Sequence, residues 1–529
     1  MRRGLLVCLI ALALPAAARA TPGDLDPTFS RDGYTRVGFG DDQSAATAIA
    51  LDPQGGAVIA GTTGPVGDDG YAPASLAVAR LTPDGKLDKS FSGDGRAKFD
   101  IGASPQVGNV ALGAGGLIVV GASAGGDLVA LRLLSDGSPD SSFAGDGIAS
   151  ADAGGTETGG SLLVGDDGTV TVGGSACFVH TCEFALARFA AAGGGLDPSF
   201  DGDGIVVTPF PGDYAVLNDL ARTPGGGVLA AGDTLFQEAA LAEYTPGGAL
   251  DGTFNGGGQA VISENTQGAR AVAVDLAGRI LGLGKFGQLY RVTADGAIDP
   301  AFARTYVYGQ AFTVDGHDRV VSAGELGGCY RGCTPVDTVL ARTDAETGAT
   351  DTTFGQSGFG HIALADLDAK PDGARAVTVD ATDRPLTAGY SGDEMAVARF
   401  ESEPGPPDRD GDGVVDSADR CPTIFSGRRD GCPRAKRKLT LHRHKRADLW
   451  TGRIKSDQDR CNAGQTVRVF RKRRGKDENT VSATSDEDGK WSADGNLRRG
   501  TYYARVERRF KPRWGTCVKA RSNAITIRR

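Results

Sequence analysis

The residues best spaced for chemistry are five aspartates within twelve positions of the sequence. They fall at positions 1, 3, 5, 9 and 12 of the loop that binds calcium in EF-hands: Asp408, Asp410, Asp412, Asp416 and Asp419. Gly413 stands at position 6, where such a loop turns sharply, and the Val414 carbonyl stands at position 7. The segment therefore predicts a Ca²⁺ site formed by Asp408, Asp410, Asp412, Val414, Asp416 and Asp419. The alternative is a solvated acidic linker.

The same segment runs directly into Cys-Pro at 421–422 and reaches a second Cys-Pro at 432–433. In this it resembles a single thrombospondin type 3 repeat, whose Asp-rich calcium motif leads into Cys-Pro. The resemblance covers residues 408–433 and implies a calcium-stiffened spacer. Residues 401–407, which read ESEPGPP, mark a Pro-rich linker before it.

Other groups suited to catalysis are few. Of the five histidines, His442 and His444 lie in a basic tail. His180 lies between Cys177 and Cys182, where zinc is an alternative to a disulfide, but a fourth ligand is missing. No His-Glu-x-x-His motif occurs. Only pairs of carboxylates, as in glycosidases, remain open as catalytic groups.

The first twenty residues predict an export signal. Two arginines precede an apolar run at 5–14, and residues 18–20 read Ala-Arg-Ala, a typical cleavage site. The run is too short to span a bilayer, so a membrane anchor, including a lipoprotein at Cys8, is the weaker alternative. We expect the mature chain to be secreted or held in the extracytoplasmic envelope, with no transmembrane segment.

The cysteines agree with export. Without Cys8, eight remain in four neighbouring pairs: Cys177/Cys182, Cys329/Cys333, Cys421/Cys432 and Cys461/Cys517. An even number of cysteines in an exported chain predicts disulfides. The first two pairs would close very short loops, whereas Cys461 and Cys517 would close a long one.

The body of the chain is repetitive and rich in glycine. Its 80 Gly lack a three-residue period, and 40% of residues are hydrophobic, which excludes collagen and wholesale disorder. A pattern of Asp, two variable residues and Phe recurs about every 54 residues. Its seven copies are LDPTF (25–29), LDKSF (87–91), PDSSF (139–143), LDPSF (196–200), LDGTF (250–254), IDPAF (298–302) and TDTTF (350–354).

Two strand patterns lie between successive copies, such as GGAVIAG (55–61) and LAVARL (76–81). Asp-Gly pairs, as in PDGK (83–86), suggest type I′ hairpin turns. Units of three or four short strands at this period predict the blades of a β-propeller. The N-terminal copy lacks the strands before it, and the last strand, MAVARF (395–400), lacks the turn after it. We expect the N-terminal segment to complete the last blade and close a seven-bladed ring, the alternative being an open solenoid.

These repeats resemble the delta-60 repeat family of bacterial extracytoplasmic propeller-like proteins, over residues 21–400. The match to its Asp-x-x-Phe-Gly-x-x-Gly signature is best at TDTTFGQSG (350–358), and FARTY (302–306) departs from it. The resemblance implies a fold and a compartment, but no reaction. One Asp per blade at a fixed offset predicts a turn-capping role, with the Phe filling the space between blades.

The tail domain, 434–529, is strongly basic. It holds 28 Lys and Arg against 10 Asp and Glu, a formal charge of +18 in a chain whose total is −9. Its alternating strands, its three Trp and the Cys461/Cys517 pair predict an Ig-like β-sandwich. Such charge favours a polyanion or glycan partner, with RKRRGK (471–476) as the densest patch, and nucleic acid is not expected outside the cell. The alternative is a solvated charged surface.

Together these features predict an all-β chain: signal peptide 1–20, a seven-bladed β-propeller 21–400, a calcium-binding linker 401–433 and an Ig-like β-sandwich 434–529. We expect a monomeric, non-enzymatic binding or adhesion protein that uses Ca²⁺. The alternative is a carbohydrate-active hydrolase or lyase with carboxylates at the central channel of the propeller.

Overall fold

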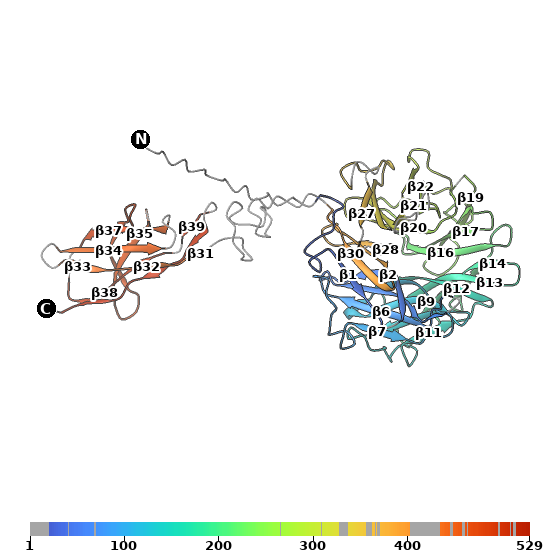
Figure 1. The fold of residues 1–529 in the computed structure, drawn as a ribbon, viewed down its shortest axis with the longest axis horizontal. Coiled ribbons are helices and arrows are strands. Elements are labelled where there is room, and N and C mark those ends of the chain that lie inside the picture. Colours follow the sequence, from blue (N-terminus) through green and yellow to red (C-terminus); the bar gives the residue numbers. More distant parts are fainter. Residues whose placement is uncertain are drawn as a thin grey trace, which may run out of the picture. The chain divides into compact units, whose positions relative to one another are not determined.

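The computed structural model describes residues 21–402 and 434–528, except 41, 68–69, 265, 308, 327–336, 356–361, 366, 368–370, 445–447, 457–460, 463, 496–497, 508 and 512–514. These residues belong to two compact units, one within Ala20–Glu403 and one within Pro404–Arg529. Both are built of β-strands (Figure 1), and a short 3-10 helix, η1 (Ala114–Gly116), lies between β8 and β9. No helix in the described part of the chain is long and apolar enough to cross a membrane.

The N-terminal unit holds seven four-stranded antiparallel sheets among its described residues. Each is named here after its first strand. The β2 sheet contains β2 (Gln43–Leu51), β3 (Ala57–Gly64), β6 (Ser75–Leu81) and β7 (Arg96–Phe99), with β4 (Val66–Gly67) and β5 (Gly70–Tyr71) as a separate small hairpin. The β8 sheet contains β8 (Gln106–Leu112), β9 (Ile118–Ala124), β10 (Asp127–Leu133) and β11 (Ile148–Ala151).

The next four sheets repeat this order. The β12 sheet contains β12 (Thr156–Val164), β13 (Val170–Cys177), β14 (Cys182–Phe189) and β15 (Ile205–Thr208), and the β16 sheet contains β16 (Ala215–Arg222), β17 (Val228–Thr234), β18 (Ala239–Tyr244) and β19 (Gln259–Ile262). The β20 sheet contains β20 (Ala271–Val274), β21 (Ile280–Leu283), β22 (Gln288–Val292) and β23 (Thr305–Tyr306). The β24 sheet contains β24 (Ala311–Val314), β25 (Arg319–Leu326), β26 (Asp337–Asp344) and β27 (Ile362–Ala365).

The last sheet joins the two ends of the unit. Its strands β28 (Asp372–Val379), β29 (Pro385–Ser391) and β30 (Glu394–Arg399) are completed by β1 (Tyr34–Val37), which pairs with β30. The first strands contact one another in succession from β2 to β28, and β28 contacts β2. In Figure 1 the blue β1 and β2 accordingly lie beside the orange β28 and β30. The pairing of the N-terminal segment with the last sheet is the one that the incomplete terminal repeats predict.

Apolar residues fill the spaces between neighbouring sheets. One cluster, for example, joins Val58 and Val78 of the β2 sheet to Val120 and Leu131 of the β8 sheet, with Phe91 among them. All seven repeat Phe side chains are buried in this way: Phe29, Phe91, Phe143, Phe200, Phe254, Phe302 and Phe354. The predicted role of the Phe as filler between units is confirmed.

The repeat Asp caps its own turn, as predicted. One carboxylate oxygen of each copy accepts the backbone N–H two residues later, from Thr28, Ser90, Ser142, Ser199, Thr253, Ala301 and Thr353. Each bond is an Asx-turn, which satisfies a backbone donor that the tight turn would otherwise leave unpaired.

An arginine from the third strand completes this arrangement in six of the seven copies. Its Nε donates to the other Asp oxygen at 2.7–2.8 Å, in Arg80, Arg132, Arg188, Arg291, Arg342 and Arg399. The guanidinium lies 4.3–5.4 Å from the Phe ring centroid. It also donates to a turn carbonyl of the neighbouring sheet, as Arg132 does to Ala191. We call this set the Arg–Asp–Phe clamp, which ties each sheet to the next.

The β16 sheet is the exception. Glu243 occupies the clamp position and faces Asp251, and burial and then the Asp251 charge raise the pKa of Glu243. A cavity of 460 Å³ lies here, lined by Glu243, Phe254, Arg279 and Arg291 among others. The clamp is therefore missing at the junction between the β16 and β20 sheets.

We expect Glu243→Arg to raise the free energy of unfolding by about 1 kcal/mol, because it restores the clamp and removes a like-charge contact. Urea unfolding of the two proteins measures the difference. Glu243→Gln is the matched control and should give a smaller gain, since it removes the repulsion without adding the ion pair. A less stable Glu243→Arg protein would show that the clamp does not transfer to this junction.

The hairpin turns differ from the prediction in one respect. Gly85, Gly137 and Gly296 have φ of 79°, 87° and 74°, but the Asp before each glycine does not have a positive φ. A type I′ turn needs positive φ at both central residues, so these turns are of another kind. In the first, Gly85 N–H donates to the Thr82 carbonyl and Thr82 N–H to the Lys86 carbonyl. The loop between Thr82 and Lys86 therefore contains three residues, so Asp84 and Gly85 do not form a two-residue turn.

The C-terminal unit has two main sheets. One contains β32 (Arg437–Leu439), β33 (His442–His444), β34 (Leu449–Ser456) and β37 (Lys490–Asp494), and the other contains β35 (Thr466–Arg471), β36 (Glu478–Thr484), β38 (Gly500–Val506), β41 (Ala520–Arg521) and β42 (Ile525–Ile527). A third, small sheet contains β31 (Arg434–Ala435), β39 (Arg509–Lys511) and β40 (Gly515–Cys517). Trp450 and Trp491 pack with Val467 and Tyr502 in one core drawn from both main sheets. Trp514 lies outside the described residues.

Two disulfides are formed among the described cysteines, Cys177–Cys182 and Cys461–Cys517. Both were predicted as nearest pairs. The first uses both thiols of the alternative zinc site near His180, so that alternative is wrong. The Cys329/Cys333 and Cys421/Cys432 pairs lie outside the described residues.

Candidate functional site

The predicted calcium site cannot be placed. All of its residues, Asp408, Asp410, Asp412, Val414, Asp416 and Asp419, lie outside the described residues, and so does the Pro-rich linker from residue 403 onward. Elsewhere among the described residues, polar side chains gather on the first and second strands of the N-terminal unit, in the turns on the opposite side of its sheets and on the C-terminal unit.

The first grouping lies on and beside the first and second strands of the β16, β20, β24 and β28 sheets. It gathers where the first strands begin, on the side of the hairpins that join the second and third strands. We call that side the hairpin face. The grouping, called here the inner-wall cluster, comprises Asn218, Asp233, Arg270, Lys285, Gln310, Glu325, Arg375 and Tyr390.

One half of the inner-wall cluster surrounds a buried carboxylate. Asp233 of β17 pairs with Lys285 Nζ at 2.7 Å and accepts the Asn218 side-chain amide at 2.9 Å and the Ala269 N–H at 3.0 Å. Asn218 is the extra residue of a bulge in β16, and this bulge turns its amide toward Asp233. Gly268 must lack a side chain, because a Cβ there would lie 1.8 Å from Asp233 Oδ1.

The other half brings two guanidinium groups onto one neutral oxygen. Gln310 Oε1 accepts Arg270 Nη2 at 2.8 Å and Arg375 Nη1 at 2.6 Å. Burial, and then the Arg375 charge, lower the pKa of Arg270. Glu325 pairs with Arg375 at 3.4 Å and accepts the Tyr390 hydroxyl at 2.9 Å, and burial followed by Glu325 raises the pKa of Tyr390 to about 12.

Asp219 lies one residue beyond the Asn218 bulge. It accepts hydrogen bonds from Ser161 Oγ of β12 and from the Val272 N–H of β20, both at 3.0 Å. It therefore links three consecutive first strands. Burial raises the pKa of Asp219 to about 6, against three hydrogen bonds that favour the ionised form. A carboxyl that titrates close to neutral pH is the described group best suited to acid–base chemistry.

The hairpin face also carries exposed apolar side chains. Phe178 with Val179, Leu235 with Phe236, and Phe286 stand at the tips of three consecutive hairpins, β13–β14, β17–β18 and β21–β22. The Cys177–Cys182 disulfide closes the first of these hairpins. Exposed apolar groups beside convergent polar ones are typical of binding surfaces.

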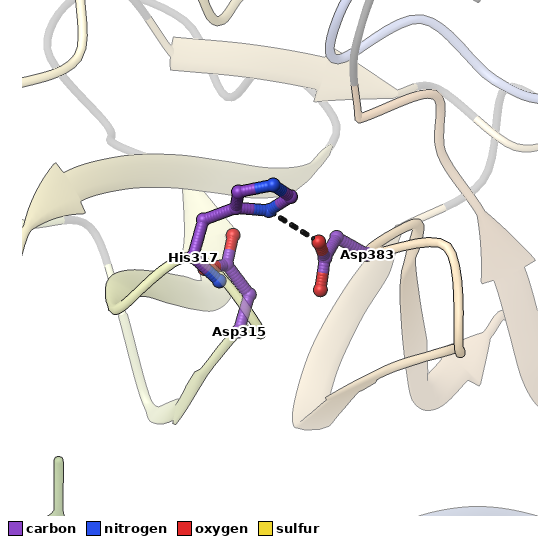
Figure 2. Close-up of side chains that lie close together, drawn as sticks. All are labelled: Asp315, His317 and Asp383. Carbon is purple, nitrogen blue, oxygen red and sulfur yellow. Dashed lines mark hydrogen bonds and ion pairs between the residues drawn. The ribbon is translucent and has the colours of Figure 1, made fainter. Parts of the chain in front are cut away.

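The second grouping lies on the opposite side of the sheets and is structural. Figure 2 shows the His317 ring facing the Asp383 carboxylate, with Asp315 beside them. His317 Nδ1 lies 2.5 Å from Asp383 Oδ2. The Asp315 carboxylate accepts the His317 and Arg319 N–H groups and pairs with Arg319 Nε. Asp315 could bind a metal only by giving up these contacts, which hold the turn together. Asp318 makes the equivalent contact one sheet earlier, where it accepts the Leu276 N–H and pairs with Arg279. The trio is therefore a contact between neighbouring turns.

The third grouping is the basic patch of the C-terminal unit. Arg473 pairs with Glu478 at 2.6 Å, and Arg471 donates to the Arg499 carbonyl. Lys472, Arg474 and Lys476 are exposed, and no ion pair is formed by any of them within the described residues. The patch is thus less basic than its sequence suggests, and three of its charges face solvent.

Comparison with known proteins finds one family model and several solved structures that resemble the N-terminal unit. Residues 58–91 and 115–143 match the model of a β-propeller family described as a domain of unknown function (DUF5122). The structure of YCF48 bound to D1 peptide is 11% identical, with a TM-score of 0.40 over 72% of this chain and 100% of that one. The WD40 β-propeller domain of Doa1 is 13% identical, with a TM-score of 0.40 over 70% of this chain and 98% of that one.

The polysaccharide lyase Uly1 is 10% identical, with a TM-score of 0.26 over 78% of this chain and 86% of that one. No curated protein matches the chain significantly. With TM-scores of 0.40 or less, neither a ligand nor a reaction follows from these likenesses, and the β-propeller fold rests on the family match and on the succession of four-stranded sheets. The N-terminal unit is a β-propeller, and its chemistry must be argued from its own side chains.

Sequence reasoning found the repeat Asp and Phe but missed the inner-wall cluster. The cluster residues fall at equivalent bulge or strand-start positions whose residue type changes from unit to unit: Asn218, Arg270, Gln310 and Arg375. The sequence signal for this cluster was therefore a polar position whose residue type changes from unit to unit, beside a strand pattern that recurs in each unit.

Proposed function

We propose that this protein is an exported, non-enzymatic binding protein of the cell surface or extracellular space. Its parts would be a seven-bladed β-propeller of the delta-60 type closed by its N-terminal segment, a calcium-binding linker like a thrombospondin type 3 repeat, and a basic Ig-like β-sandwich. The two disulfides and the strand pairing between β1 and β30 support export and closure.

One observation carries the preference for binding. Both carboxylates of the inner-wall cluster already have partners, Asp233 with Lys285 and Glu325 with Arg375 and Tyr390. Glycosidase chemistry needs one carboxyl free to give a proton and a second free to attack or to activate water. Two guanidinium groups converging on Gln310 instead favour a ligand with an anionic or strongly polar group.

The test is a glycan array that contains acidic and neutral oligosaccharides, probed with the full chain. Arg375→Ala and Phe236→Ser should each weaken the binding of any hit at least tenfold, because one removes a charged donor and the other an exposed apolar contact. Arg222→Ala, on the opposite face, is the matched control. Binding that survives both hairpin-face changes would place the ligand elsewhere.

The alternative is a carbohydrate-active hydrolase or lyase, and Asp219 is the observation that favours it. Its pKa of about 6 would let it act as a general acid near neutral pH. Turnover of an array hit that disappears in Asp219→Asn, while binding of the hit is retained, would establish the enzyme. If incubation of the protein with every array hit yields no product, the binding protein is favoured over the enzyme.

We expect the full chain to bind an anionic polymer through the C-terminal unit, with affinity that falls steeply as salt rises, since each neutralised charge releases counterions. Replacing Lys472, Arg474 and Lys476 together with Ser should lower the salt concentration needed for elution from heparin. The charge-neutral change Arg473→Ser with Glu478→Ser is the control and should leave elution unchanged. If the unchanged chain and both variants elute at the same salt concentration, the patch is a solvated charged surface rather than a binding site.

A further inference from the structure

Three carboxylates meet where the β8 and β12 sheets adjoin. Asp127 is the first residue of β10, Asp152 follows β11, and Glu157 is the second residue of β12. One oxygen from each lies within 4.8 Å of the others. The antiparallel order of the strands accounts for the meeting, because β10 begins and β11 ends on the hairpin face, where the chain then crosses to β12.

Glu157 is buried and incompletely partnered. Only 2% of its surface is exposed, and its Oε2 has no hydrogen-bond partner among the residues that the structure describes. Its Oε1 accepts the N–H of Gly155, from its own loop, at 3.0 Å. Within the described residues, no Lys or Arg lies within ion-pair distance of Asp127, Asp152 or Glu157. Leaving a buried carboxylate oxygen unpaired is costly, so this oxygen points to a missing partner.

Other junctions show what the equivalent residue normally does. At two of them, a side-chain oxygen near the start of a first strand accepts a backbone N–H from the third strand of the preceding sheet. Ser44 Oγ accepts the Met395 N–H at 3.2 Å, and Asp372 Oδ1 accepts the Thr338 N–H at 2.7 Å. Glu157 makes no such bond and faces the Asp127 carboxylate instead. The Glu157 N–H does donate to the Gly126 carbonyl, so among the described residues this junction lacks only the side-chain contact that the other two have.

We propose that Asp127, Asp152 and Glu157 bind a divalent cation, with the chemistry of Ca²⁺, that joins the β8 sheet to the β12 sheet. Three carboxylates without a nitrogen or sulfur ligand suit a hard cation. Ca²⁺ accepts six to eight oxygens in irregular geometry, so water and backbone carbonyls can complete the shell, whereas Mg²⁺ demands a near-ideal octahedron. Asp152 is exposed, which gives the ion a path from solvent.

This site is distinct from the linker segment and from the inner-wall cluster. A bound cation would supply the partner that Glu157 Oε2 lacks. Burial, and then the charges of Asp152 and Asp127, raise the pKa of Glu157, and the cation would cancel this repulsion between carboxylates. A proton on Glu157 is the competing way to relieve the same cost, and the experiment must separate the two.

The experiment uses the full chain carrying Asp410→Ala and Asp412→Ala, which disables the linker segment. Equilibrium dialysis with radioactive Ca²⁺ should still show one bound ion per chain, and millimolar Ca²⁺ should raise the melting temperature of the propeller. Adding Glu157→Gln should weaken this binding at least tenfold and abolish the shift. Glu183→Gln, on the hairpin face of the β12 sheet, is the matched control and should change neither measurement.

Two results would overturn the proposal. Either the parent protein binds no Ca²⁺ at millimolar concentration, or Glu157→Gln retains the ion and the shift. A Glu157→Gln protein that is more stable than its parent without calcium, in a chain that binds none, would assign the unpaired oxygen to a protonated carboxyl.

Discussion

Replacing Asp26 with Ala is expected to lower the free energy of unfolding of the propeller by about 3–5 kcal/mol. Asp26 is fully buried and forms the clamp that joins the N-terminal segment to the last sheet, with Arg399 Nε at 2.7 Å and Arg384 Nη1 at 3.0 Å. Its removal leaves the buried Arg399 guanidinium without a carboxylate, while Arg384 keeps its pair with Asp380. The loss falls where the N-terminal segment meets β30, two parts of the unit that no continuous chain joins. Urea unfolding followed by circular dichroism measures the loss.

Asp251→Ala is the matched control, because Asp251 holds the same turn position in the one copy that lacks the arginine. It accepts the Thr253 N–H and hydroxyl but no guanidinium. Its replacement should cost about 1 kcal/mol, the worth of the Asx-turn bonds alone. Equal losses in the two proteins would show that the turn, rather than the clamp, carries the stability.

The pH dependence offers a second check on the same ion pair. Burial raises the pKa of Asp26, but hydrogen bonds from Thr28 and the charges of Arg399 and Arg384 outweigh it and hold the pKa below its ordinary value. A carboxyl whose pKa is depressed on folding adds stability above its unfolded pKa and loses it as the pH falls through the folded pKa. The difference between the wild type and Asp26→Ala should therefore be full at pH 7 and shrink below about pH 4.

The repeat pattern made the sheets predictable, because each strand pattern and each Asp-x-x-Phe turn recurs at a fixed place. The turn role of Asp140 and the burial of Phe143 followed from their residue types alone. Arg132 was visible in the same repeat, yet its role was not predicted. It lies on β10, eight residues before Asp140, and the two side chains meet only because the chain folds back through the antiparallel bridge between Leu133 and Pro139.

The polar sites were unpredictable for a related reason. Arg270, Gln310 and Arg375 come from three different sheets, and no short motif contains any two of them. Glu157 and Asp127 are likewise 30 positions apart and meet only because neighbouring sheets adjoin. Regular repeats thus reveal the frame of such a protein, while its chemistry lies in side chains that depart from the repeat.

The Cys461–Cys517 disulfide is expected to carry much of the stability of the C-terminal unit. It closes a loop with a sequence separation of 56, and cross-linking a loop of that length contributes about 4 kcal/mol in the chain-entropy model. Both cysteines are buried, so Cys461→Ala with Cys517→Ala removes the cross-link and adds little steric strain. We expect this unit, whose core rests on Trp450 and Trp491, to melt far below the propeller.

Tryptophan fluorescence isolates this transition, because all three Trp of the chain lie in the C-terminal domain. Cys177→Ala with Cys182→Ala is the matched control. It opens a loop with a separation of only 5, which should cost the propeller about 2 kcal/mol at most and leave the fluorescence transition unchanged. A C-terminal transition that keeps its midpoint without Cys461–Cys517 would mean that the packed sheets alone hold the unit. The basic patch would then need no cross-link to present its charges.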